Sequence, residues 1–319
     1  MKKAVKNSAK IAAAAAGALG GSGYLVFKYV MDRDASADKI MDFFLKFGKT
    51  AKLEEPETPD ERVVWFDNQK FETHEIINDR SQKLRAHLLK AEKESKVFAL
   101  CSHGYRNHGK GEFNYMAKFY HDLGINVFMV DHQAAGESEG KFIGFGYYES
   151  RDLLKWVNYI IATYGDDVQI LLHGVSMGSA TVMMVSGSEN LPANVKFTVA
   201  DCGYTTALEE FLYNLKLYKV PAHPLIDTAD LFNRKISGYS FKDADALSAV
   251  KKAKLPMLFI HGTADDFVPT YMGEQLYNAC SSEQKKLVLV DGAVHARSYR
   301  VNSELYEASV KEYIDKFID

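Results

Sequence analysis

The chain has 319 residues, of which 47% are hydrophobic and 25% are charged, and its formal net charge at pH 7 is -3. This balance is typical of a globular protein, with one large or two small domains, that can bury a sizeable core. The charge leaves no basic excess, so we expect no nucleic-acid partner.

The first 31 residues resemble a signal peptide or signal anchor. Lysines at positions 2, 3, 6 and 10 precede an uncharged stretch over residues 11–27, which is the pattern of such segments. We therefore predict membrane association through residues 11–31, with the rest of the chain anchored or exported outside the cytoplasm. Because weakly inserting alanine and glycine dominate the stretch, a surface helix on a cytoplasmic protein is the alternative.

A mixed connector follows over residues 32–61 and ends in an acidic, proline-bearing run, which indicates a linker before a main domain at 62–319. From there apolar, strand-like runs alternate with segments of helical spacing. The expected strands are 63–66, 73–77, 97–102, 125–130, 168–172, 195–200, 256–260 and 286–290, and the expected helices are 113–123, 147–164, 180–186, 272–279 and 303–317. This alternation predicts a parallel sheet with helices on both faces, and ligands of such sheets bind at the carboxyl ends of the strands.

One stretch breaks the alternation. Residues 206–254 show helical spacing without a convincing strand, and they include several aromatic side chains. Inserted between two strands, such a stretch would cover the carboxyl ends of the sheet as a cap. We expect it to line an acyl pocket, which weakly favours an apolar substrate. The alternative is that its aromatic residues only pack on the domain.

The strongest chemical signal is a Gly-x-Ser-x-Gly motif over residues 174–178, with Ser176 at its centre. An apolar strand enters the motif and a helix of small residues leaves it, as in a nucleophile elbow. The glycines relieve clashes in such a strained turn. A nucleophilic serine needs a base, and His295 is the best candidate because it lies in a loop between the last strand and the last helix.

An acid must orient the histidine and stabilise its cation. Asp265 follows the strand predicted at 256–260, so its carboxylate can reach a loop beside the neighbouring strand. Asp201, at the end of another strand, and Asp266 are weaker alternatives. The oxyanion of an acyl-transfer intermediate needs two donors, for which we propose the backbone N–H groups of Met177 and Tyr105. The phenol of Tyr105 is a candidate third donor.

Metal chemistry has no support in the sequence. The histidines show no ligand pairing on one helix. The three cysteines, Cys101, Cys202 and Cys280, are too far apart for a disulfide framework or a metal knuckle. Cys101 and Cys202 lie in or beside apolar strands, which is typical of buried, unreactive thiols.

The order Ser176, Asp265, His295 resembles the α/β-hydrolase fold from about residue 62 to the end. The closest branch is that of bacterial monoacylglycerol-lipase-like and serine-aminopeptidase-like hydrolases. The matching segments are 103–105 (His-Gly-Tyr), 136–140 (Gly-Glu-Ser-Glu-Gly), the serine motif, and 261–269. The resemblance implies an eight-stranded sheet, a cap between the sixth and seventh strands, no cofactor, and hydrolysis of an ester, thioester or small amide.

The segment 131–136 departs from this resemblance. Relatives carry Asp-x-Arg-x-His-Gly, whereas this chain has Asp-His-Gln-Ala-Ala-Gly and lacks the Arg and His that usually support loops. The leading hypothesis is a serine hydrolase that cleaves a carboxylic ester through an acyl-enzyme. A peptidase or acyltransferase with the same triad and a non-catalytic, membrane-tethered binding protein are the alternatives.

Overall fold

The computed structural model describes residues 20–35 and 60–319, which contain a single eight-stranded sheet. The strand order is β1-β2-β4-β3-β5-β6-β7-β8, and every pair from β4 to β8 is parallel. Only β1 with β2 and β2 with β4 are antiparallel. The strands are β1 (Glu72–Ile77), β2 (Lys83–Leu89), β3 (Val97–Ser102), β4 (Asn126–Asp131), β5 (Gln169–Val175), β6 (Val195–Asp201), β7 (Met257–Gly262) and β8 (Lys285–Val290). The predicted fold class is confirmed.

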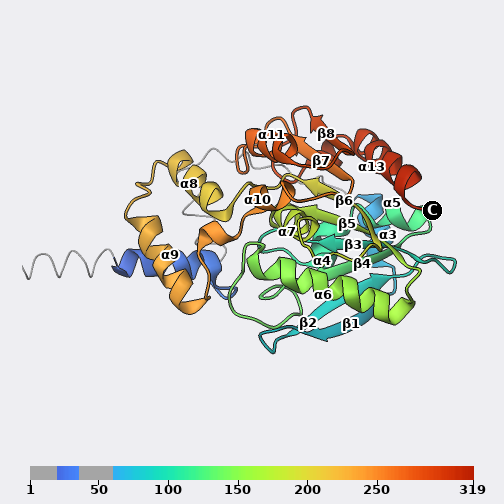
Figure 1. The fold of residues 1–319 in the computed structure, drawn as a ribbon, viewed down its shortest axis with the longest axis horizontal. Helices are drawn as coiled ribbons and strands as arrows, with labels where there is room; N and C mark the ends of the chain where they lie inside the picture. Colours follow the sequence, from blue (N-terminus) through green and yellow to red (C-terminus); the bar gives the residue numbers. More distant parts are fainter. Residues whose placement is uncertain (1–19, 36–59) are drawn as a thin grey trace, which may run out of the picture.

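Helices cover both faces of this sheet (Figure 1). Alternate side chains of β3 show why: Phe98 and Leu100 pack with α6 on one face, whereas Ala99 and Cys101 pack with α5 and α13 on the other. Each buried strand therefore has apolar residues on both faces, as parallel strands require. The covering helices are α4 (Gly109–Phe113), α5 (Ala117–Asp122), α6 (Tyr147–Tyr164), α7 (Met177–Ser186), α11 (Thr270–Ala279), α12 (Ser298–Val301) and α13 (Ser303–Phe317).

The start of the main domain differs from the sequence prediction. Residues 63–66 were expected to form a strand because they are β-branched and aromatic, but they lie in helix α3 (Glu61–Asp67). The Asp60 side chain accepts a hydrogen bond from the Arg62 N–H and caps the helix, while Phe66 is buried. A cap and tertiary burial thus override strand propensity. Strand β2 was not predicted, because charged residues interrupt its buried Leu84, Ala86 and Leu88.

The stretch 206–254 is helical, as predicted. It contains α8 (Ala207–Leu217), α9 (Leu225–Ile236), the short 3-10 helix η1 (Phe241–Asp243) and α10 (Ala246–Val250), and it connects β6 to β7. Helices α8 and α9 extend to one side of the sheet, whereas α10 packs on α7 (Figure 1). We call residues 206–254 the cap.

The N-terminal residues 20–31 form a helix that lies beside α9 (Figure 1). Its Phe27 and Met31 are 1% and 0% exposed and belong to the same apolar cluster as residues of the cap. Residues 1–19 of the predicted anchor and 36–59 of the predicted linker lie outside the described residues. Within the described ranges, no helix combines the length and apolar character needed to span a bilayer.

The central strands should tolerate less change than the edge. Leu172 on β5 is 0% exposed, whereas Leu289 on β8 is 39% exposed. Replacing Leu172 by Ala removes buried methyl groups and leaves a cavity, so we expect a loss of about 2–5 kcal/mol in unfolding free energy. The matched change Leu289→Ala should cost less than about 1 kcal/mol. Urea unfolding of both variants measures the difference, and equal losses would contradict the packing described.

Candidate active site

The turn between β5 and α7 holds Ser176 in an unusual backbone conformation. Its φ of 56° and ψ of -118° lie in a sparsely populated region for a residue with a side chain. The flanking glycines explain how the turn closes. A Cβ on Gly174 would lie 2.1 Å from the carbonyl oxygen of Gly178, and a Cβ on Gly178 would lie 1.9 Å from that of Ser102. The turn therefore presses against the end of β3, and only glycine fits at either position.

Three side chains predicted from the sequence meet at this turn. The Ser176 Oγ lies 2.8 Å from the His295 Nε2. The His295 Nδ1 lies 2.8 Å from the Asp265 Oδ2. These two hydrogen bonds connect a hydroxyl, an imidazole and a carboxylate in the order that general-base activation of a serine requires. The residues come from three different strand ends, after β5, β7 and β8.

The Asp265 side chain is fully buried, and both carboxylate oxygens have hydrogen-bond partners. Its Oδ1 accepts the N–H groups of Phe267 and Val268 at 3.1 and 2.9 Å. Its Oδ2 faces His295 and lies 3.4 Å from the His261 Nε2. Although burial opposes ionisation, the neighbouring His295 and His261 lower the pKa of Asp265 to about 2. The carboxylate is therefore ionised at neutral pH and can stabilise an imidazolium.

The two alternative acids are placed differently. Asp266 is exposed. Asp201 is buried at the end of β6, where its Oδ2 accepts a hydrogen bond from the Tyr306 hydroxyl at 3.2 Å. Its Oδ1 has no hydrogen-bond partner among the described residues. Burial raises the pKa of Asp201 to about 7, so this carboxyl is a poor partner for a histidine cation.

Two backbone N–H groups are available to an oxyanion beside Ser176. Met177 is the first residue of α7, so its N–H has no acceptor within the helix. The N–H groups of Met177 and Tyr105 donate no hydrogen bond to another described residue. A Cβ built on Gly104, just before Tyr105, would lie 3.3 Å from the Ser176 Cβ, so this loop borders Ser176. We call residues 103–106 the oxyanion loop.

The Tyr105 phenol does not serve as the third donor considered from the sequence. Its hydroxyl donates instead to the Val30 carbonyl oxygen at 2.8 Å. The ring packs 5.1 Å from the Phe145 ring, centroid to centroid, and Phe145 in turn contacts Phe211 of the cap. Ser176 itself is 7% exposed. A row of aromatic rings thus connects the loop beside Ser176 to the cap.

Several supporting residues were missed by the sequence analysis. The Glu112 carboxylate accepts the Gly104 N–H at 2.9 Å and fixes the oxyanion loop, and burial raises the pKa of Glu112. The His132 Nε2 lies 2.7 Å from the Ser102 Oγ, and the backbone N–H of His132 donates to the His103 Nε2 at 3.0 Å. Burial lowers the pKa of His103 to about 4, so the pair is neutral. Ser102 and His103 thus hold His132, which lies in the segment that lacks the usual Arg and His. The spacing of these residues in the sequence does not predict their contacts.

Two residues of the Ser176 site belong to a group of side chains that could in principle bind a metal ion. Ligand atoms of Cys202, Asp265 and His295 all lie within 4.8 Å of one another. The carboxylate and the imidazole already bond each other. Burial, then the charges of Asp201 and Asp265, raise the pKa of the Cys202 thiol, which opposes the thiolate that a metal needs. We interpret the group as part of the acid–base pair rather than as a metal site.

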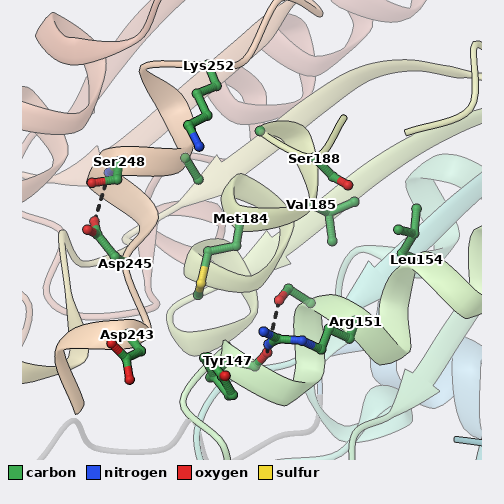
Figure 2. Close-up of a pocket in the computed structure, with 13 residues that line it drawn as sticks. Tyr147, Arg151, Leu154, Met184, Val185, Ser188, Asp243, Asp245, Ser248 and Lys252 are labelled. Carbon is green, nitrogen blue, oxygen red and sulfur yellow. Dashed lines mark hydrogen bonds between the residues drawn. The ribbon is translucent and has the colours of Figure 1, made fainter. Parts of the chain in front are cut away.

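A separate groove of about 430 Å³ lies on another part of the surface (Figure 2). It is bordered by α6, α7 and the cap, and Arg151, Asp243, Asp245 and Lys252 line it. The Asp245 carboxylate accepts the Ser248 N–H and so caps α10. No residue of the Ser176 site lines this groove.

Comparisons with known proteins agree with the fold. The chain matches the model of the prolyl oligopeptidase family over residues 111–318. It is 33% identical to the uncharacterized protein YqkD of Bacillus subtilis over 218 residues, 68% of this chain and 70% of that protein. It is 26% identical to the monoglyceride lipase of Rattus norvegicus over 251 residues, 69% of this chain and 82% of the lipase. An esterase of Pyrococcus furiosus has a similar structure, with a TM-score of 0.64 and 20% identity over 83% of this chain and 96% of the esterase.

The mostly parallel sheet of eight strands and these likenesses define an α/β hydrolase, as the sequence resemblance implied. Within that superfamily, the chain belongs to the prolyl oligopeptidase family.

The buried Asp201 should make stability depend on pH. Its folded pKa of about 7 lies above the ordinary carboxyl value of 3.8. The protonated form therefore supports folding at low pH, and this support is lost as pH rises from about 4 through about 7. An amide carries no charge at either pH, so Asp201→Asn does not lose this support. The melting temperature of Asp201→Asn minus that of wild type should therefore be larger at pH 8 than at pH 4.5. Thermal unfolding at both values measures this, and a gap that shrinks with pH would contradict the buried placement.

Proposed function

We propose that the protein is a serine hydrolase that cleaves carboxylic esters through an acyl-enzyme. The observation that carries the proposal is the chain of two 2.8 Å hydrogen bonds from Ser176 through His295 to Asp265. It has the geometry of a nucleophile, its base and the acid that orients the base. The hydrolase fold and the esterase and lipase among the similar proteins support the same chemistry.

The proposed reaction begins when the Ser176 Oγ attacks the acyl carbonyl carbon and the His295 Nε2 takes the hydroxyl proton. The N–H groups of Met177 and Tyr105 stabilise the oxyanion of the tetrahedral intermediate. The intermediate collapses as His295 returns the proton to the leaving alkoxide, which departs as an alcohol. A water molecule then attacks the acyl-enzyme with His295 as base, and His295 gives this proton to the Ser176 oxygen as the bond to the acyl group breaks and the carboxylic acid leaves. Asp265 stays ionised throughout and orients His295.

The aromatic rings between the oxyanion loop and the cap favour an apolar acyl chain. The rings of Tyr105, Phe145 and Phe211 form a row of contacts that connects the oxyanion loop to the cap. Burying an apolar chain against such rings stabilises a complex by roughly 25 cal/mol per Å² of apolar surface. Charged acyl groups would lose hydration there without a partner among these rings.

A peptidase is the second candidate, because the matching family is that of prolyl oligopeptidase. The same triad can attack an amide, provided that His295 protonates the leaving amine. Parallel assays with an ester and an amide of the same acyl group separate the two activities. A higher kcat/KM for the amide would favour the peptidase over the esterase.

Removal of the nucleophile or the base should abolish turnover. Ser176→Ala and His295→Ala should each lower kcat by on the order of a million-fold, because the triad acts as a unit. The assay is a panel of p-nitrophenyl esters that differ in acyl length, run on wild type and variants at equal folded concentration. Activity retained by Ser176→Ala at more than about a hundredth of the wild-type rate would exclude Ser176 as the nucleophile.

The assignment of the acid has its own test. Asp265→Asn should lower kcat by about ten thousand-fold, because an amide leaves the histidine in the wrong tautomer. Asp201→Asn is the matched control, since Asp201 is also a buried carboxyl at a strand end. Its kcat should stay within about tenfold of wild type, which corresponds to less than about 1.4 kcal/mol. The reverse order of effects would show that Asp201 is the acid.

A further inference from the structure

The oxyanion loop is bound to the N-terminal segment 20–35 through Arg106. The guanidinium donates to the carbonyl oxygens of Tyr29 at 2.7 Å, Asp32 at 3.0 Å and Ala35 at 3.0 Å. Its Nε also donates to the Tyr105 hydroxyl at 2.8 Å. One side chain thus connects the residue that carries the oxyanion N–H to three carbonyls of a segment about 75 residues earlier in the sequence.

These contacts use the unpaired end of a helix. The last carbonyls of a helix lack partners within it. Here the Tyr29 oxygen accepts from Arg106, the Val30 oxygen from the Tyr105 hydroxyl, and the Met31 oxygen from the Ile143 N–H. The main domain therefore caps the helix over residues 20–31, and two of the three caps come from the oxyanion loop.

Arg106 holds its position at a cost in backbone energy. Its φ is 56°, in the left-handed region that residues with side chains adopt rarely. Such a conformation is strained and persists only where surrounding contacts enforce it. The four hydrogen bonds of the guanidinium are contacts of this kind. Together with the Glu112 carboxylate on the Gly104 N–H, they hold the loop from both sides of Tyr105.

The N-terminal segment is itself fixed at two other places, so it can serve as a support. Arg33 donates to the carbonyl oxygens of Ser138 at 2.7 Å and Gly136 at 3.0 Å. Next to the cap, a Cβ on Gly23 would lie 2.0 Å from the Thr228 Oγ1 of α9, so the two helices are in close contact. The segment therefore connects the oxyanion loop, the loop after β4 and the cap.

We propose that Arg106 is a positioning residue, which aligns the Tyr105 N–H for the oxyanion by binding the carboxyl end of the N-terminal helix. The inference rests on the proposed function, because it concerns the same Ser176 site. It makes the carbonyl groups of Tyr29, Asp32 and Ala35 part of the support of the oxyanion loop. Cleavage of a signal peptide within this segment would remove partners of Arg106, so this alignment requires that these residues remain on the active enzyme.

The test compares two arginines that hold the same segment in the full-length chain. Arg106→Ala should lower kcat for an ester by about ten- to a hundredfold, somewhat less than complete loss of an oxyanion donor. KM should change by less than about threefold, since the loss arises in the transition state. Arg33→Ala is the matched control: it removes the bonds of the same segment to the loop after β4 but leaves all four Arg106 bonds in place, so its kcat should stay within about threefold of wild type.

A second measurement separates alignment from simple loss of stability. A trifluoromethyl ketone forms a tetrahedral adduct with the serine and needs the same oxyanion donors, so its inhibition constant should rise by the factor by which kcat/KM falls. Should Arg106→Ala fail to fold, Arg106→Lys keeps the stem and the charge but not the planar fork, and a kcat loss of at least about fivefold is expected.

The possible outcomes are distinct. Folded Arg106→Ala or Arg106→Lys with a lower melting temperature but wild-type kcat and ketone affinity would overturn the inference. A loss of kcat in Arg33→Ala equal to that in Arg106→Ala would overturn it too, because the effect would then come from the whole segment. Wild type that neither hydrolyses esters nor binds the ketone would contradict the proposed function instead.

Discussion

The site depends on one tight contact, the packing of the Ser176 turn against the end of β3. Gly174 and Gly178 let backbone atoms approach where any side chain would overlap a carbonyl oxygen. That approach sets Ser176 in its strained conformation and brings the start of α7 beside the oxyanion loop. The strain is supported by a buried strand, since β5 lies between β3 and β6 in the middle of the sheet. Ser176 and the Met177 N–H take their positions from this turn, whereas His295 and Tyr105 reach it from the loops after β8 and β3.

The charge states of the two buried carboxyl groups near the turn depend on the polar partners of each group. Asp265 and Asp201 are both buried at the carboxyl ends of neighbouring strands. Burial opposes the ionisation of Asp265, but the charges and hydrogen bonds of His295 and His261 lower its pKa to about 2. Asp201 has one phenol partner and one oxygen without a partner among the described residues, and burial raises its pKa to about 7. At neutral pH the same side chain is thus ionised in one place and about half protonated in the other.

Strong local patterns in the sequence were enough to predict most strands of the sheet and the meeting of Ser176, Asp265 and His295. Each of these residues follows an apolar run whose end lies at one edge of a parallel sheet. The strand predicted at 63–66 was wrong. The segment is helical because of a cap at Asp60 and the burial of Phe66, and strand propensity reflects neither. Strand β2 was missed for a similar reason, since charged residues separate its buried ones.

Contacts between distant segments could not be predicted from the sequence. Arg106 and Tyr29 carry no motif, and only the fold brings the guanidinium to that carbonyl. The same holds for Glu112 and Gly104, whose bond crosses a loop without any characteristic spacing. Such residues set the fine alignment of a site, whereas motifs identify only the groups that take part in the chemistry.

Reaction of the native protein with a fluorophosphonate, followed by peptide mapping, tests the central claim most directly. The reagent phosphonylates a serine only when a base and an oxyanion site activate it. The account predicts one modified residue, Ser176, and loss of the modification in His295→Ala. Modification of another residue, or an unmodified Ser176 in folded wild-type protein, would contradict it.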